Sequence, residues 1–108
     1  MQAAFQINIR DNVATALEDL RPGPVRILGD TDRGEALCTE AIPKGHKMAL
    51  KDMGVEEDVM KYGVRIGRTG KTVRAGQWVH LHNMHSVYDE RSGHLDIHTG
   101  APTDISYE

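Results

Sequence analysis

The chain of 108 residues is poor in cysteine and in aromatic residues, with one cysteine and five aromatic side chains. A single cysteine excludes an internal disulfide. Cys38 has small and apolar neighbours and no basic residue beside it, which predicts a buried thiol rather than a reactive one. We therefore expect a core of aliphatic and methionine side chains in a protein of the reducing cytoplasm.

Long apolar runs and an excess of positive charge are also missing. No segment approaches the roughly 20 apolar residues of a membrane-spanning helix, and residues 1–5 lack the features of a signal peptide. With 13 Lys and Arg against 16 Asp and Glu, the formal net charge is -3. This balance is not typical of proteins that bind nucleic acid or an anionic membrane, and we expect neither partner.

Several catalytic motifs are absent as well. No Gly-x-Ser-x-Gly, Cys-x-x-Cys or His-Glu-x-x-His sequence occurs, so neither a hydrolase triad nor structural zinc is supported. Residues 63–72 superficially resemble a phosphate-binding loop, but the glycine spacing is wrong and no helical pattern follows, so we interpret them as a hairpin. A chain of this length holds one modest core, which is small for a self-contained multistep enzyme.

The periodicity of the first residues predicts a strand followed by one short helix. Residues 4–9 alternate apolar and polar, with Phe5 on the apolar face of an opening strand. Residues 11–12, Asp and Asn, can cap a helix, and apolar residues follow at i, i+3, i+4 and i+7 over residues 13–20. The Pro-Gly pair at residues 22–23 would end this helix after about two turns.

The remaining pattern is mainly β. From residue 25 onward, short apolar runs alternate with turns that contain Gly and Pro, as expected for short strands. The acidic residues 56–58 are interpreted as a solvated face. After residue 84 the sequence becomes polar with scattered apolar residues, so we expect one domain over residues 1–84 and a tail over residues 85–108 that is mobile or bound to a partner.

A His-x-His pair is the first candidate site. In a strand, His80 and His82 would point the same way with Cα atoms roughly 6.5 Å apart. Two imidazoles on one face can share a metal or an anion. Ordinary half-exposed strand histidines are the alternative, because this spacing occurs by chance and the sequence fixes no third ligand.

Two polar pairs lie beside turn glycines. His46 and Lys47 follow Gly45 directly, where exposed backbone amides and a cation can hold a carboxylate. Lys61 and Tyr62 can present an ammonium and a phenol to an oxygen-rich substrate. The alternatives are a surface His beside a surface Lys, and a packed Tyr beside a solvated Lys.

Four ordered motifs carry a family resemblance that covers about residues 5–84: DNVATAL at 11–17, IPKGHKMAL at 42–50, KYGVRIG at 61–67 and HLHN at 80–83. Together they resemble the small SAF-type domain of the altronate and galactarate dehydratase family, and sulfolactate sulfo-lyase is similar in organisation. The resemblance implies a compact β-clip fold, found at the N-terminus of long sugar-acid dehydratases or as a separate small subunit.

The resemblance also implies a chemistry. Such lyases remove the proton α to a carboxylate and expel a β-hydroxyl group or sulfite, and a hydroxy acid substrate then gives a 2-keto-3-deoxy acid. Iron(II) or manganese(II) would assist, held on this chain or mainly by the partner subunit. The implied catalytic residues are His80, His82 and His46, with His80 and His82 also as metal ligands. The implied substrate-binding residues are Asp11, Asn12, Lys47, Lys61 and Tyr62.

The implied partners are a large catalytic dehydratase subunit and a small sugar acid, with a homo-oligomer as a further option. A different class stays open, because SAF-like domains also occur as binding or chaperone modules. The chain would then be a non-catalytic sugar-acid-binding or assembly module, whose histidines never meet the reacting carbon.

Overall fold

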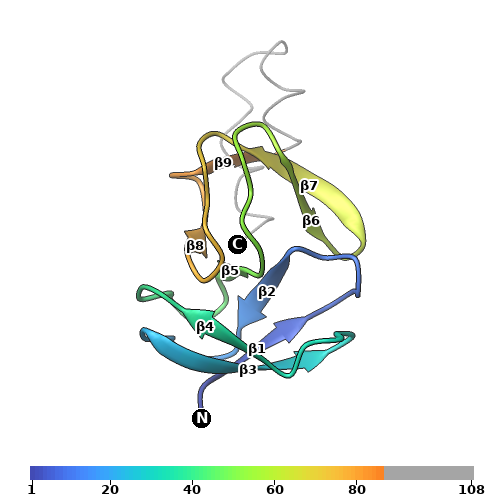
Figure 1. Ribbon diagram of the computed structural model, residues 1–108. Helices are drawn as coiled ribbons and strands as arrows, with labels where there is room; N and C mark the ends of the chain where they lie inside the picture. Colours follow the sequence, from blue (N-terminus) through green and yellow to red (C-terminus); the bar gives the residue numbers. More distant parts are fainter. Residues whose placement is uncertain (87–108) are drawn as a thin grey trace.

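The computed structural model describes residues 1–86, which form nine strands in two sheets and contain no helix. The first sheet has the order β4-β3-β1-β2-β5-β8 and the second the order β6-β7-β9 (Figure 1). The predicted mainly β fold is therefore confirmed. The strands are β1 Ala3–Gln6, β2 Val13–Ala16, β3 Gly23–Gly29, β4 Glu35–Cys38, β5 Lys47–Ala49, β6 Asp58–Lys61, β7 Val64–Thr69, β8 Trp78–Val79 and β9 Met84–Ser86.

The first sheet combines one parallel pair with antiparallel neighbours. β1 is parallel to β3 and antiparallel to β2. β2 then pairs with β5, and β5 with β8, both antiparallel. In Figure 1 the β5 and β8 strands are drawn between the rest of this sheet and the second sheet above it. The β5–β8 pair thus brings residues near 46 next to residues near 80.

Two apolar clusters fill the body, and β5 contributes to both. Met48 belongs to the cluster packed against β1–β4, whereas Ala49 belongs to the cluster packed against β6, β7 and β9. All three residues of β5 are buried, as expected for a strand that is packed on both faces. His46, which directly precedes β5, therefore lies where a fully buried strand meets the surface.

Residues 13–16 form strand β2, so the predicted helix is wrong. Their backbone pairs with β1 on one side and β5 on the other. An isolated helix of about two turns is marginal, whereas a central strand has both edges hydrogen-bonded and suits the β-branched Val13 and Thr15. Asp11 and Asn12 consequently cap no helix and carry out a different task, described below.

The opening strand is present, but it is shorter than predicted and its large side chain points outward. β1 ends at Gln6, and Phe5 is 40% exposed beside its cross-strand partner Leu28. The small Ala4 and the polar Gln6 are the buried residues. Alternation sets the period of a strand but not which face meets the core, and a shift of one residue exchanges the two faces.

The second sheet extends to the last described residue. Residues 63–72 contain β7, which forms a hairpin with β6 and also pairs with β9. The boundary expected after residue 84 falls inside β9, which ends at Ser86. Of the predicted tail over residues 85–108, residues 87–108 lie outside the described residues. Within residues 1–86, no helix is long and apolar enough to cross a membrane.

Candidate functional site

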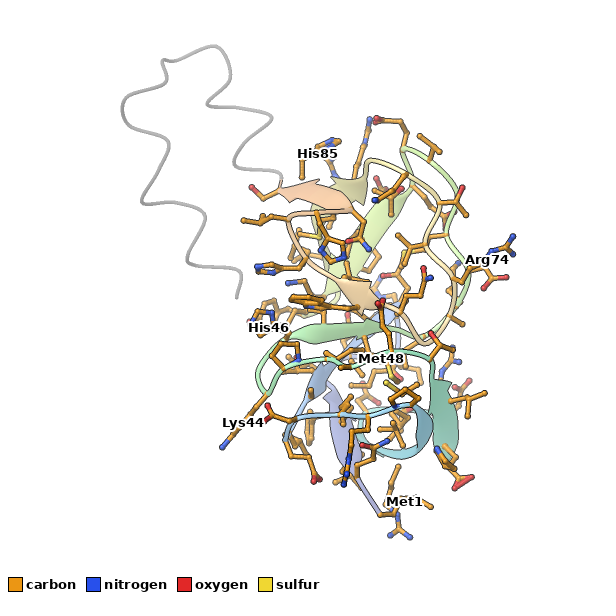
Figure 2. The ribbon with its side chains drawn as sticks, turned by 90° about the vertical axis from the view of Figure 1, so that its left-hand side faces the viewer. Met1, Lys44, His46, Met48, Arg74 and His85 are labelled. Carbon is orange, nitrogen blue, oxygen red and sulfur yellow. The ribbon has the colours of Figure 1, made fainter. Side chains whose placement is uncertain are left out.

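Trp78 lies at the centre of a cluster of aromatic rings where β5 meets β8. The pairing of Met48 with Trp78 and of Lys47 with Val79 sets His46 beside the end of β8, next to His80. Figure 2 shows His46 at the level of β5, below the second sheet, with His85 well apart at the upper end. The side chains of His46, His80 and His82 all contact the indole of Trp78.

The ring geometry is close and specific. The indole stacks on His80, with centroids 5.7 Å apart and planes at 10°. It meets His82 at 4.9 Å and 53°, and His46 edge-on at 5.5 Å and 66°. His46 and His80 are also in contact at 4.7 Å. The indole Nε1–H donates a hydrogen bond of 3.2 Å to Nδ1 of His46.

His80 and His82 both contact the Trp78 indole, but not because they share a strand face. β8 ends at Val79, and residues 80–83 form a turn instead of continuing the strand. Asn83 holds this turn: its Oδ1 accepts the His80 N–H at 2.9 Å, and its Nδ2 donates to the Trp78 carbonyl at 2.8 Å. The two imidazoles therefore flank the indole because of the turn, so the predicted common strand face is wrong.

A polar cavity of about 340 Å³ opens beside His82. Glu40 lines the cavity with a carboxylate, which accepts a hydrogen bond from the Trp78 backbone N–H at 2.9 Å. The exposed Lys71 lines it with an ammonium group. A cavity with a cation, a carboxylate and an imidazole can bind a small polyhydroxy acid through several hydrogen bonds. Its lining residues are Glu40, Lys71, Thr72, Gln77, His82 and Asn83.

Sequence reasoning missed three residues of this region: Trp78, Glu40 and Lys71. Glu40 and Lys71 are far apart in the sequence, and only the folded chain brings them to one cavity. Trp78 offered a signal, since it is the only tryptophan and stands two residues before His80. An aromatic residue beside a His pair is a natural packing surface for the imidazoles.

Asp11 lies in a second group of polar residues, at the turn of the β6–β7 hairpin. It is 4% exposed. Its carboxylate accepts three backbone N–H groups, from Gly63 at 2.8 Å, Asn8 at 3.0 Å and Tyr62 at 3.1 Å. Both central residues of the turn, Tyr62 and Gly63, have positive φ. The carboxylate thus stabilises a strained turn.

Asn12, Lys61 and Tyr62 complete this second group. The Asn12 amide pairs with the β6 backbone, accepting the Met60 N–H at 2.8 Å and donating to the Asp58 carbonyl at 2.9 Å. Lys61 is buried, with Nζ 5.0 Å from the centroid of the exposed Tyr62 ring. In the described chain, Asp11 and Asn12 therefore position the hairpin, and their predicted contact with substrate stays a prediction.

The length of β2 separates the two groups. At one end, the Leu50 N–H donates to the Asn12 carbonyl, and at the other the Ala16 N–H donates to the His46 carbonyl. Four residues of strand at about 3.3 Å each span roughly 13 Å. Lys47, on β5 between these ends, is only 1% exposed. The structure thus brings together the three predicted histidines, and it holds Asp11, Asn12, Lys61 and Tyr62 apart from them.

The donor set of the described residues does not make a complete metal site. Residues 1–86 contain no group of three or more His, Cys, Asp or Glu side chains arranged to hold a metal ion. His80 and His82 could contribute imidazoles to a site completed by another chain. A metal bound by residues 1–86 alone does not fit this arrangement.

The Cys38 thiol is buried, as the sequence predicted. Burial raises its pKa above the usual thiol value, a hydrogen bond with the Glu40 backbone opposes this rise, and the nearby Glu40 carboxylate adds to it. A thiol held in its neutral form is a poor nucleophile. Cys38 is therefore a packing residue of the first apolar cluster.

Comparison with known proteins gives consistent matches. The family model described as the altronate/galactarate dehydratase SAF domain matches residues 2–87. The (2R)-sulfolactate sulfo-lyase subunit alpha of Chromohalobacter salexigens is 49% identical over 45 residues, which are 42% of this chain and 48% of that protein. Altronate dehydratase of Escherichia coli is 37% identical over 79 residues, 73% of this chain and 15% of that enzyme. Altronate dehydratase of Bacillus subtilis is 30% identical over 84 residues, 77% of this chain and 16% of that enzyme.

Proposed function

The chain belongs to the SAF-domain family of altronate and galactarate dehydratases, and from that premise we propose that it is the small subunit of a sugar-acid dehydratase. With a large catalytic subunit it would eliminate water from a hydroxy acid and give a 2-keto-3-deoxy acid. The observation that carries the proposal is the family match together with three imidazoles gathered around one indole. The curled β sheets also suit the β-clip form of the SAF domain.

The sizes of the relatives support a partner subunit. The matched region makes up only 15% and 16% of the altronate dehydratases, so most of those enzymes is other protein. It makes up 48% of a short relative whose name describes it as a subunit. A small chain that works with a large catalytic subunit is consistent with the small share of the altronate dehydratases and with the larger share of the sulfo-lyase subunit. A cytoplasmic location and a further homo-oligomeric assembly are part of the same proposal.

The ring cluster suits elimination chemistry. Loss of a β-hydroxyl group requires a proton for the leaving oxygen, and removal of the weakly acidic α-proton requires a base. Imidazole is the side chain that most often serves as a general acid or base, and three imidazoles meet in this cluster. Lys71 of the adjacent cavity can hold the carboxylate of the acid. Iron(II) or manganese(II), bound mainly by the large subunit, would polarise the carboxylate and α-hydroxyl group when present.

A 2-keto acid assay on each subunit and on their mixture tests this function. We expect turnover only from the mixture, and a loss of about a hundredfold or more on changing an acid or base group, as in His80→Ala. His85→Ala is the matched control, because His85 lies on β9, well apart from His46 (Figure 2). Robust activity from the small chain alone, or equal losses in both variants, would contradict the proposal. An assembled complex that binds sugar acids without turnover would favour the binding or assembly module instead.

A further inference from the structure

We propose that Trp78 is a positioning residue that fixes His46 as a hydrogen-bond donor through Nε2. The tautomer follows from the geometry of this chain alone, and only its consequence for turnover rests on the proposed function. The inference begins with the bond of 3.2 Å between Nε1 of Trp78 and Nδ1 of His46.

The direction of this hydrogen bond is fixed by chemistry. An indole N–H can donate but cannot accept, so Nδ1 of His46 must present its lone pair. A neutral imidazole carries one proton on its two nitrogens, and that proton must then reside on Nε2. While the bond is made, neutral His46 has no lone pair left on Nε2. It can donate a hydrogen bond there, but it cannot bind a metal or accept a proton.

Both the backbone and the ring of Trp78 are held in place. The Trp78 backbone N–H donates to Glu40 Oε2 at 2.9 Å, and the Trp78 carbonyl accepts from Asn83 Nδ2 at 2.8 Å. Pairing with Met48 fixes the strand register, and the indole ring stacks on His80 at 10°. A donor held this firmly selects a tautomer more strongly than a mobile side chain does.

This assignment separates the roles of the histidines. His46 is restricted to donating, which suits a carboxylate or a departing hydroxyl oxygen of a hydroxy acid. The predicted metal ligands are His80 and His82, and the inference leaves their roles unchanged. Trp78 touches all three rings, yet it acts on the reaction only through them.

Nitrogen NMR of the full chain tests the tautomer directly. Long-range proton–nitrogen correlations at about pH 8, where free imidazoles are neutral, should show His46 Nδ1 without a proton and Nε2 with one. Trp78→Phe, or replacement of the single indole by its benzothiophene analogue, removes the donor and should give a mixture of both tautomers. The analogue keeps the size and stacking of the ring, so it serves if the Phe variant does not fold. A proton on Nδ1 in the wild-type chain, or an unchanged tautomer in the analogue, would overturn the proposal.

Two amide substitutions at His46 test the consequence for turnover. In His46→Gln the amide nitrogen stands near the Nε2 position and keeps the donor, whereas in His46→Asn the amide oxygen keeps only the acceptor for Trp78. We expect His46→Gln to keep kcat of the assembled enzyme at least about tenfold above that of His46→Asn, the scale of one hydrogen bond to a charged group. Equal losses in kcat would refute the donor role. If the assembly has no lyase activity, the proposed function fails while the NMR result still decides the tautomer.

Discussion

Replacement of Asp11 should destabilise the fold more than replacement of any other loop carboxylate that the structure describes, because Asp11 is buried. The side chain accepts backbone N–H groups of Asn8, Tyr62 and Gly63, and so it joins the β1–β2 loop to the β6–β7 turn. Without it, three donors near the protein interior lose their partner. The turn would also lose the contact that offsets positive φ at Tyr62.

The magnitude follows from the number of bonds and from their burial. A donor left unsatisfied in the interior costs about 1–3 kcal/mol, and the lower end applies here because the exposed Tyr62 lets water reach the turn. Three donors give about 3 kcal/mol for Asp11→Ala, which lowers Tm by about 12–24 °C for a domain of this size. Asp11→Asn keeps one accepting oxygen and should cost about half as much. Asp30→Ala is the matched control, because exposed Asp30 accepts a single N–H, from Ile9, and should cost at most about 1 kcal/mol.

Urea unfolding with a shared m value, together with thermal melts, measures these differences. The expected order of stability is wild type, Asp30→Ala, Asp11→Asn and Asp11→Ala. A loss below about 0.5 kcal/mol for Asp11→Ala, or an equal loss for Asp30→Ala, would refute the positioning role. If Asp11→Asn folds normally yet loses turnover with a raised KM, the predicted contact with substrate regains support.

Three further predictions concern the thiol, a glycine and an imidazole. The pKa of Cys38 is raised in the folded state, so the unfolded chain releases its thiol proton at lower pH than the folded chain does. The free energy of unfolding should therefore be constant at pH values below the usual thiol pKa and fall as pH rises through it. Cys38→Ala should remove that fall in alkaline urea titrations. A Cβ on Gly76 would lie 2.2 Å from the Leu37 carbonyl oxygen at φ +92°, whereas one on Gly70 would meet nothing within 4 Å, so in thermal melts Gly76→Ala should cost at least about 2 kcal/mol and Gly70→Ala much less. His82→Ala should lower turnover of the assembled enzyme about a hundredfold and shift stability by only about 0.5 kcal/mol, as measured by turnover and thermal midpoint together.

The sequence by itself determined the class of the fold and the family. Short apolar runs separated by turn residues after residue 25 predict short strands, and local chemistry suffices for that inference. The burial of Cys38 was equally readable, because its neighbours carry no charge that would activate a thiol. The family resemblance depended on residue order alone, and the match over residues 2–87 confirms it.

Only the tertiary structure decided how the first residues fold. The apolar spacing of residues 13–20 suits a helix locally, but β1 and β5 flank residues 13–16 and satisfy their backbone as a strand. Pairing with distant segments outweighs a local preference of a few tenths of a kcal/mol per residue. The same long-range packing buries Ala4 and exposes Phe5, a choice that alternation cannot make.

The candidate site shows the same division at the level of single atoms. The sequence named His46, His80 and His82, because imidazoles are recognisable wherever they stand. It did not place Trp78 among them or show that residues 80–83 turn, since both depend on the pairing of β5 with β8 and on bonds made by Asn83. Residue types are written in the sequence, whereas the distance and direction between two side chains exist only after strands remote in sequence have paired.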